Sequence, residues 1–131
     1  MNPHNIVTDG QLKVSFDDTT GSILISTPKG NIIELNDQLN VLKLSDQFQN
    51  CITMNRNGIQ LDSHGDISIS GLNIHLKAIS NIDLKAEMNV STQALNIEQR
   101  ADASFTASGA ASAELSSSGQ TKVKGAIVNI N

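Results

Sequence analysis

A repeat of about eight residues runs through the second half of the chain, from about Gly65 to Asn131, and it constrains the fold more than any other feature. Each unit holds a pair of mostly apolar residues separated by one polar residue, and a small residue follows two positions after the pair. Successive pairs begin seven or eight residues apart. The pairs begin at Ile67, Ile74, Ile82, Val90, Ile97, Phe105, Ala113, Thr121 and Val128, and the small residues are Gly71, Ala78, Ala86, Ala94, Ala101, Gly109, Ser117 and Gly125.

We call the pair members and the small residues the slot residues, because their lack of charge indicates an interior. The 26 slot residues between Ile67 and Ile130 include no charged residue, although ten charged residues lie in the same span. Alternation with a period of two is typical of strands with one buried face. Residues 93–115 are rich in alanine, which by propensity alone would suit a helix. Their apolar residues form no helical stripe, however, and the repeat continues through them, so strands are favoured.

The first half of the chain also alternates, with turn sequences between its apolar runs. Strands are predicted at Gln11–Phe16, Ser22–Ser26, Asn31–Leu35, Val41–Ser45 and Cys51–Asn55. Turns are predicted at Asp17–Gly21, Thr27–Gly30 and Asn57-Gly58. The pattern divides the chain into three parts. These are residues 1–10, a flexible leader or the start of a fragment; residues 11–58, a strand and turn section; and residues 59–131, which carry the repeat.

The shortness of the repeat indicates how its interior closes. A single-chain β-solenoid needs a longer coil than eight residues to go round once. Three chains that each contribute one short strand to a layer would close a triangular layer. The predicted fold is therefore all-β: an intertwined homotrimeric triple-stranded β-helix, preceded by a β-prism-like section of short antiparallel strands. The predicted trimer core consists of Ile67, Ile69, Ile74, Leu76, Ile82, Leu84, Val90, Ile97, Phe105, Leu115 and Val123.

Composition argues against several functional classes. The net charge is −4 and no basic cluster is present, which disfavours a nucleic-acid binder. The single cysteine, Cys51, rules out a disulfide framework within the chain. No catalytic, cofactor or metal motif occurs, and the absence of Trp and Tyr disfavours a carbohydrate-cleaving enzyme. The acidic and histidine residues are interpreted as turn or surface residues: Asp17, Asp18, Asp37, Asp46, His4, His64 and His75.

The repeat and three further stretches resemble a known family. The stretches are TPKGNIIELND, GIQLDSHGDISI and the terminal KGAIVNIN. They are similar to VgrG, the spike protein of type VI secretion, and to the C-terminal needle of cell-puncturing spikes of contractile phages, over roughly Thr27 to Asn131. The resemblance implies a non-enzymatic trimeric spike of a contractile injection system. Such a spike is assembled in the bacterial cytoplasm or on a phage tail, is delivered outside, and helps to breach a target membrane mechanically.

The resemblance also implies partners at both ends of the spike. In this family the blunt C-terminal end binds a small conical tip protein of the PAAR type, and hub and OB-fold domains, absent from these residues, join the other end to the tail tube. The spike carries the tip protein or effectors. The predicted docking site is the last unit, where the rod ends: Ala126, Ile127, Val128, Asn129, Ile130 and Asn131. The alternative function is a trimeric fibre or adhesin stalk without a puncturing role. No cofactor or metal ion is expected.

Overall fold

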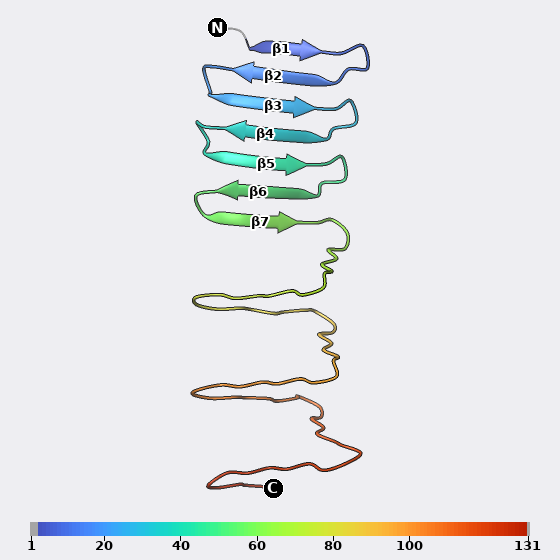
Figure 1. Cartoon of the computed structure of the whole chain (residues 1–131), viewed down its shortest axis with the longest axis vertical. Coiled ribbons are helices and arrows are strands. Elements are labelled where there is room, and N and C mark those ends of the chain that lie inside the picture. Colours follow the sequence, from blue (N-terminus) through green and yellow to red (C-terminus); the bar gives the residue numbers. More distant parts are fainter. Residues whose placement is uncertain (1–2, 131) are drawn as a thin grey trace. The chain divides into compact units, whose positions relative to one another are not determined.

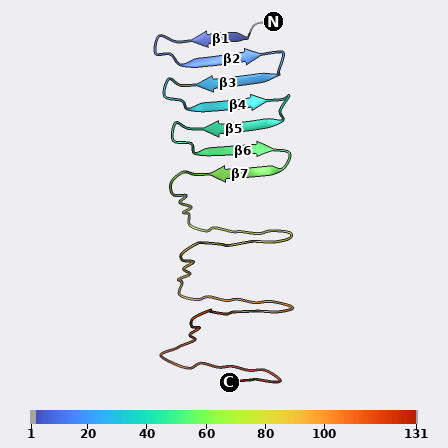
Figure 2. The ribbon, with the colours of Figure 1, turned by 180° about the vertical axis from the view of Figure 1, so that it is seen from behind.

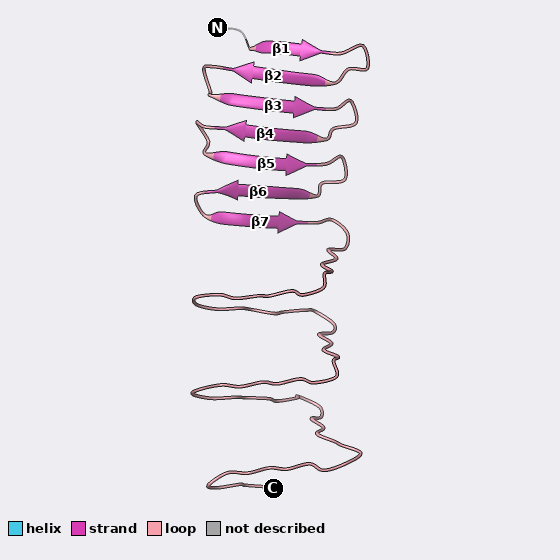
Figure 3. Cartoon of the chain, in the orientation of Figure 1, coloured by secondary structure: helices cyan, strands magenta, loops and turns pink. Residues whose placement is uncertain are grey.

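A computed structural model describes residues 3–130 and shows an all-β chain (Figures 1 and 3). Seven strands form one antiparallel sheet, and residues 3–130 contain no helix. The predicted all-β class is therefore confirmed. Nothing in the described part of the chain has the helical length and apolar character needed to cross a bilayer. The chain divides into two compact units, Met1–Leu76 and Lys77–Asn131.

The sheet of the first unit is a meander in which each strand pairs with the next one along the chain. Strands β1 and β7 are the two edges of the sheet, as Figures 1 and 2 show from opposite sides. The strands are β1 (His4–Val7), β2 (Lys13–Asp17), β3 (Ser22–Ser26), β4 (Ile32–Asn36), β5 (Val41–Ser45), β6 (Cys51–Asn55) and β7 (Gly58–Asp62).

The register of the strands places the apolar residues on one face of the sheet. Residues that lie directly opposite each other in an antiparallel pair share a face, so each row of partners can be followed from strand to strand. One row is apolar across all seven strands, and a second row is apolar across six and continues to His4 in β1. The first row is Ile6, Val14, Ile25, Ile33, Leu44, Ile52 and Leu61, and the second is Phe16, Ile23, Leu35, Leu42, Met54 and Ile59. We call this surface the apolar face.

The turns along one side of the sheet repeat every 19 residues. They span residues 8–12, 27–31 and 46–50. In each turn the fourth residue donates its backbone N–H to the carbonyl of the first, at 2.9, 3.0 and 3.4 Å. That fourth residue has a positive φ in each case: 61° for Gln11, 90° for Gly30 and 69° for Gln49. A left-handed residue at this point lets the chain reverse tightly, so each turn returns the chain as an antiparallel strand.

Most of the predicted strands are confirmed. The strands at Ser22–Ser26, Val41–Ser45 and Cys51–Asn55 have the predicted bounds, and β4 is shifted by one residue from the prediction. The predicted turn at Thr27–Gly30 is also confirmed by the hydrogen bond from the Gly30 N–H to the Thr27 carbonyl. Alternation and turn chemistry point to the same boundaries in this part of the chain, which explains the agreement.

Three details of the first unit differ from the predictions. Residues 1–10 do not form only a flexible leader, because β1 lies within them and pairs with β2 through Ile6 and Val14. Leu12 lies in a turn, outside β2. The tight turn between β6 and β7 is Arg56-Asn57, and Gly58 is already the partner of Asn55 in the sheet. Strand β7 therefore continues the antiparallel pairing beyond the predicted boundary at residues 58–59.

After β7 the backbone runs in straight stretches separated by short bends, and we call residues 63–130 the bent segment. From Leu72 onward, each bend begins directly after a small slot residue. The eight straight stretches between bends contain six residues each, and bends of one or two residues account for intervals of seven or eight. The repeat read from the side chains in the sequence therefore has the same spacing and phase as the bends of the backbone. The bends are residues 64–65, 72, 79–80, 87–88, 95, 102–103, 110–111, 118–119 and 126–127.

The bent segment makes no backbone–backbone hydrogen bond within the chain over residues 63–130. It also contains no residue with a positive φ in that range. Within Lys77–Asn131 the course of the chain repeats in Figure 1: a run across the view, a run back, and a run seen nearly end on. No part of residues 93–115 is helical, contrary to the alternative based on alanine content.

Candidate functional site

The apolar face of the sheet is open in the single chain. No residue among 3–130 is buried. At the middle of the sheet Ile33 is 38% exposed, and on the edge strand β7 Ile59 is 75% exposed. The opposite face carries mostly polar partners, such as Glu34 beside Lys43. A large, continuous apolar surface on one side of a sheet is typical of an interaction surface.

The predicted core residues of the bent segment are exposed as well. Their exposed fractions run from 50% for Ile74 to 78% for Leu115. The slot residues recur regularly along the sequence, yet the single chain does not bury their side chains. Along this segment the backbone groups form no hydrogen bonds to one another within the chain, and the apolar side chains are exposed. Folded proteins pair their buried backbone groups, so burial of these side chains requires partners for the backbone as well.

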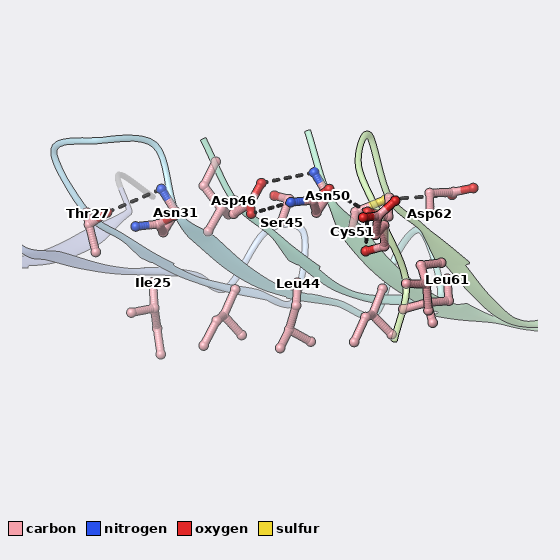
Figure 4. Close-up of a pocket in the computed structure, with 16 residues that line it drawn as sticks. Ile25, Thr27, Asn31, Leu44, Ser45, Asp46, Asn50, Cys51, Leu61 and Asp62 are labelled. Carbon is pink, nitrogen blue, oxygen red and sulfur yellow. Dashed lines mark hydrogen bonds between the residues drawn. The ribbon is translucent and has the colours of Figure 1, made fainter. Parts of the chain in front are cut away.

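A trough lies at the side of the sheet where the turns repeat every 19 residues, and residues of both faces line it, such as Leu44 and Cys51. Its volume is about 550 Å³. Figure 4 shows the side chains of Ile25, Leu44 and Leu61 on one side of the sheet, and the polar side chains of the turns on the other. Ile67, the first slot residue after β7, also lines the trough. The sheet and the first slot residue after it therefore line the same trough.

Four residues hold the chain where the sheet passes into the bent segment, and we call Asp46, Asn50, Ser63 and His64 the junction cluster. The Asn50 Nδ2 group donates to Asp46 Oδ2 at 2.8 Å. The Asn50 side-chain oxygen accepts from the His64 backbone N–H at 2.8 Å and from Ser63 Oγ at 3.1 Å. One amide side chain thus ties the turn between β5 and β6 to the first bend after β7.

The same link occurs one turn earlier in the sheet. Asn31 is the last residue of its turn, as Asn50 is of the next, and its side-chain oxygen accepts from the Gln47 backbone N–H at 3.4 Å. In both cases the last residue of one turn binds the backbone of the following connection. The bend at residues 64–65 is therefore attached to the turn at residues 46–50 in the same way as that turn is attached to the one at residues 27–31.

Hydrogen bonds to carboxylates favour the charged form at two turn residues. The side chain of Asn50, together with the backbone N–H groups of Asn50 and Phe48, holds the pKa of Asp46 below its usual value of 3.8. The Thr19 backbone N–H, which donates to Asp17 Oδ1 at 2.9 Å, lowers the pKa of Asp17. Both carboxylates thus accept hydrogen bonds from backbone N–H groups of the turns that follow β2 and β5, although Asp17 itself is the last residue of β2.

The predicted docking residues lie at the far end of the bent segment. Ala126 and Ile127 form the last bend, and Ile127 is 82% exposed. Val128 is less exposed than Ile130. Asn131 lies outside the described residues. In the single chain this end of the described residues carries exposed apolar side chains, and its role in docking stays a prediction.

Other chemistry-bearing residues do not gather into a site. Cys51 is half-buried on the polar face, with its Sγ 3.7 Å from Asp62 Oδ2. Within residues 3–130 no group of three histidine, cysteine or acidic residues is placed to hold a metal ion. Comparison with known protein families and with curated protein sequences finds no match to this chain.

The eight-residue repeat does not predict the junction cluster. Asn50 and His64 are 14 residues apart, and neither is a slot residue. A signal was nevertheless present in the chain. Residues 8–26, 27–45 and 46–62 align as one repeated unit in which Asn31 and Asn50 occupy the same position. An internal repeat of this length, if recognised, points to equivalent roles for the two asparagines.

Proposed function

We propose that this chain is a structural spike of a contractile injection apparatus, which helps to puncture a target cell envelope. In the proposed assembly three copies form a closed rod: a β-prism of three sheets followed by a triple-stranded β-helix. The spike is assembled in the bacterial cytoplasm or on a phage tail and delivered outside. Hub and tail-tube components join one end of it, and a PAAR-type tip protein or effectors ride on the other.

One observation carries the proposal. The bent segment keeps a strict register of uncharged slot residues and bends over more than sixty residues, while residues 63–130 form no backbone–backbone hydrogen bond within the chain. Water could satisfy the backbone groups, but it would leave the apolar side chains exposed. Other copies of the same chain satisfy both, because strands from neighbouring copies pair along the backbone and turn their slot residues to a common interior.

The apolar face of the sheet supports the same arrangement. Its two rows of apolar residues form one surface that no layer of residues 3–130 buries. Three such faces turned toward one axis cover one another, which is how a β-prism forms its core. The resemblance of the repeat to VgrG and to phage spikes supports a puncturing role for such a rod, and a closed rod without free strand edges resists both unfolding and aggregation.

Binding of a tip protein tests the function. The full chain and a variant lacking residues 126–131 are each mixed with a tagged PAAR-type protein, and retained chain is measured together with the mass of each chain in solution. We expect the full chain to be retained, and the shortened chain to remain trimeric but to be lost from the tagged protein. A trimer that binds no such protein would favour a fibre or stalk. A shortened chain that loses its trimer would make residues 126–131 structural.

A further inference from the structure

The outer edge of β7 has no strand beside it. β7 pairs with β6 on one side only and is the last strand in the order of the sheet. All its side chains are exposed, and Ile59 and Leu61 continue the apolar face up to this edge. An open strand edge next to an apolar surface is a template for another strand.

The chain's own next stretch does not take this place. The chain leaves β7 through a bend at residues 64–65 that contains no residue of positive φ, so it is deflected without being reversed. The bond from the His64 N–H to Asn50 holds the bend against the sheet, and Gly65 N–H donates to Ser63 Oγ at 3.1 Å. No backbone hydrogen bond joins residues 66–71 to β7.

The stretch 66–71 nevertheless has the pattern that the β7 edge requires. Ile67 and Ile69 are separated by one polar residue, as Ile59 and Leu61 are, and the two pairs begin eight residues apart. A small residue follows each pair two positions later, Ser63 in one case and Gly71 in the other. A copy of this stretch laid beside β7 would place all four apolar side chains on the same face.

We propose that the outer edge of β7 pairs in parallel with residues 66–71 of a second copy of the chain. This inference rests on the proposed trimer. Around a threefold axis, β7 of every copy runs in the same rotational sense. The bend at residues 64–65 carries each chain to the neighbouring side without reversing it. There the stretch 66–71 meets the β7 edge of the neighbour and runs parallel to it.

The slot pattern determines the register of this pair. Ile67 lies beside Ile59 and Ile69 beside Leu61, so that each pair faces the interior. Ser68 then lies beside Gln60, and Ser70 beside Asp62, on the outer surface. The junction cluster is the crossing point, because Asn50 of one chain holds the bend from which that chain passes to its neighbour. The change from pairing within a chain to pairing between chains occurs at this step.

Cysteine cross-linking tests the register. In a Cys51→Ser background, Gln60→Cys and Ser68→Cys are combined and the protein is oxidised. Neighbouring strands are about 5 Å apart, within the range that a disulfide spans. We expect each chain to bond to the next, so that a covalent ring of three chains is the dominant band on a denaturing gel without reductant. Asp62→Cys with Ser70→Cys, one step along the same register, should give the same ring.

The matched control combines Gln60→Cys with His75→Cys. His75 lies between Ile74 and Leu76, as Ser68 lies between its slot residues, but one unit later and on the next side of the rod, so no ring is expected. A trimer in solution without a covalent ring in either test variant would overturn the inference and leave the proposed function standing. A monomeric mass for the Cys51→Ser background would overturn both. Failure of both test variants to assemble would also contradict the inference, since outward positions tolerate cysteine.

Discussion

The sheet and the bent segment share the same alternation of apolar and polar residues, but only the sheet forms backbone hydrogen bonds between its own strands. In the sheet every strand pairs within the chain, because turns with a left-handed residue such as Gly30 or Gln49 reverse it. In the bent segment no described residue has a positive φ, although five glycines lie there. Its one- or two-residue bends only deflect the chain. Reversal or deflection therefore decides whether strands can pair within one chain.

Both regions still leave one face open. The sheet satisfies its backbone and exposes its apolar face, while the bent segment exposes its slot residues and its backbone together. Assembly should therefore matter for both regions and be indispensable only for the second. The predictions that follow test this difference.

The largest effect is expected for a charge in a slot of the bent segment. Val90→Asp would place three carboxylates in the interior of the trimer, where burial of each unpaired charge costs several kcal/mol. We expect the trimer to be lost, as measured by light scattering. Ser91→Asp, one residue along and outside the slots, should leave the trimer intact. Equal behaviour of the two variants would mean that the slots are not an interior.

A second prediction uses two adjacent isoleucines on opposite faces of β4. Ile33 lies on the apolar face and Ile32 on the other, and in the single chain Ile32 is the less exposed of the two. If the apolar face is covered in the assembly, Ile33→Ala should destabilise by about 2–5 kcal/mol. Ile32→Ala should cost less, in thermal unfolding at matched concentration. The reverse order is expected if the single chain is the folded form.

A smaller loss is expected at the small slot residue Gly109. A side chain at this position would clash with the Ser112 carbonyl oxygen, which lies just beyond the bend at residues 110–111. Gly109→Ala should therefore cost about 1–3 kcal/mol, as overpacking does. Gly65→Ala is the control, since its added Cβ would meet no atom within 4 Å. A neutral Gly109→Ala would show that this bend opens freely.

The smallest effect is expected for the dependence of thermal stability on pH, through Asp46. Because hydrogen bonds lower the pKa of Asp46 in the folded state, its carboxylate stabilises the fold above its unfolded value of 3.8. That contribution is lost as the pH falls through the folded value. Asp46→Asn should weaken the fold near neutral pH and flatten the loss of thermal stability below about pH 4. A loss of thermal stability in acid as steep for Asp46→Asn as for the unmodified chain would contradict this assignment.

Much of the fold follows from local patterns in the chain. The strand at Val41–Ser45 and the register of the bends could be predicted because side-chain alternation, turn residues and small residues agree locally. Strand β1 was not predicted, because it has only four residues and only Ile6 and Val7 among them are apolar, too few to show an alternation, even though Asp9-Gly10 after it is a turn sequence. The junction cluster depends on the Asn50 side chain, which accepts from a backbone group 14 residues away. A repeat of eight residues does not predict such a contact.

The mass of the chain in solution tests the central claim most directly. One chain has a mass of 13.9 kDa. If the open apolar face and the unpaired backbone are the inner surfaces of a closed rod, light scattering of the full chain should give three times that mass over a wide range of concentration. The species should also persist in SDS without heating. A mass of 13.9 kDa, with the chain still folded by circular dichroism, would contradict the account.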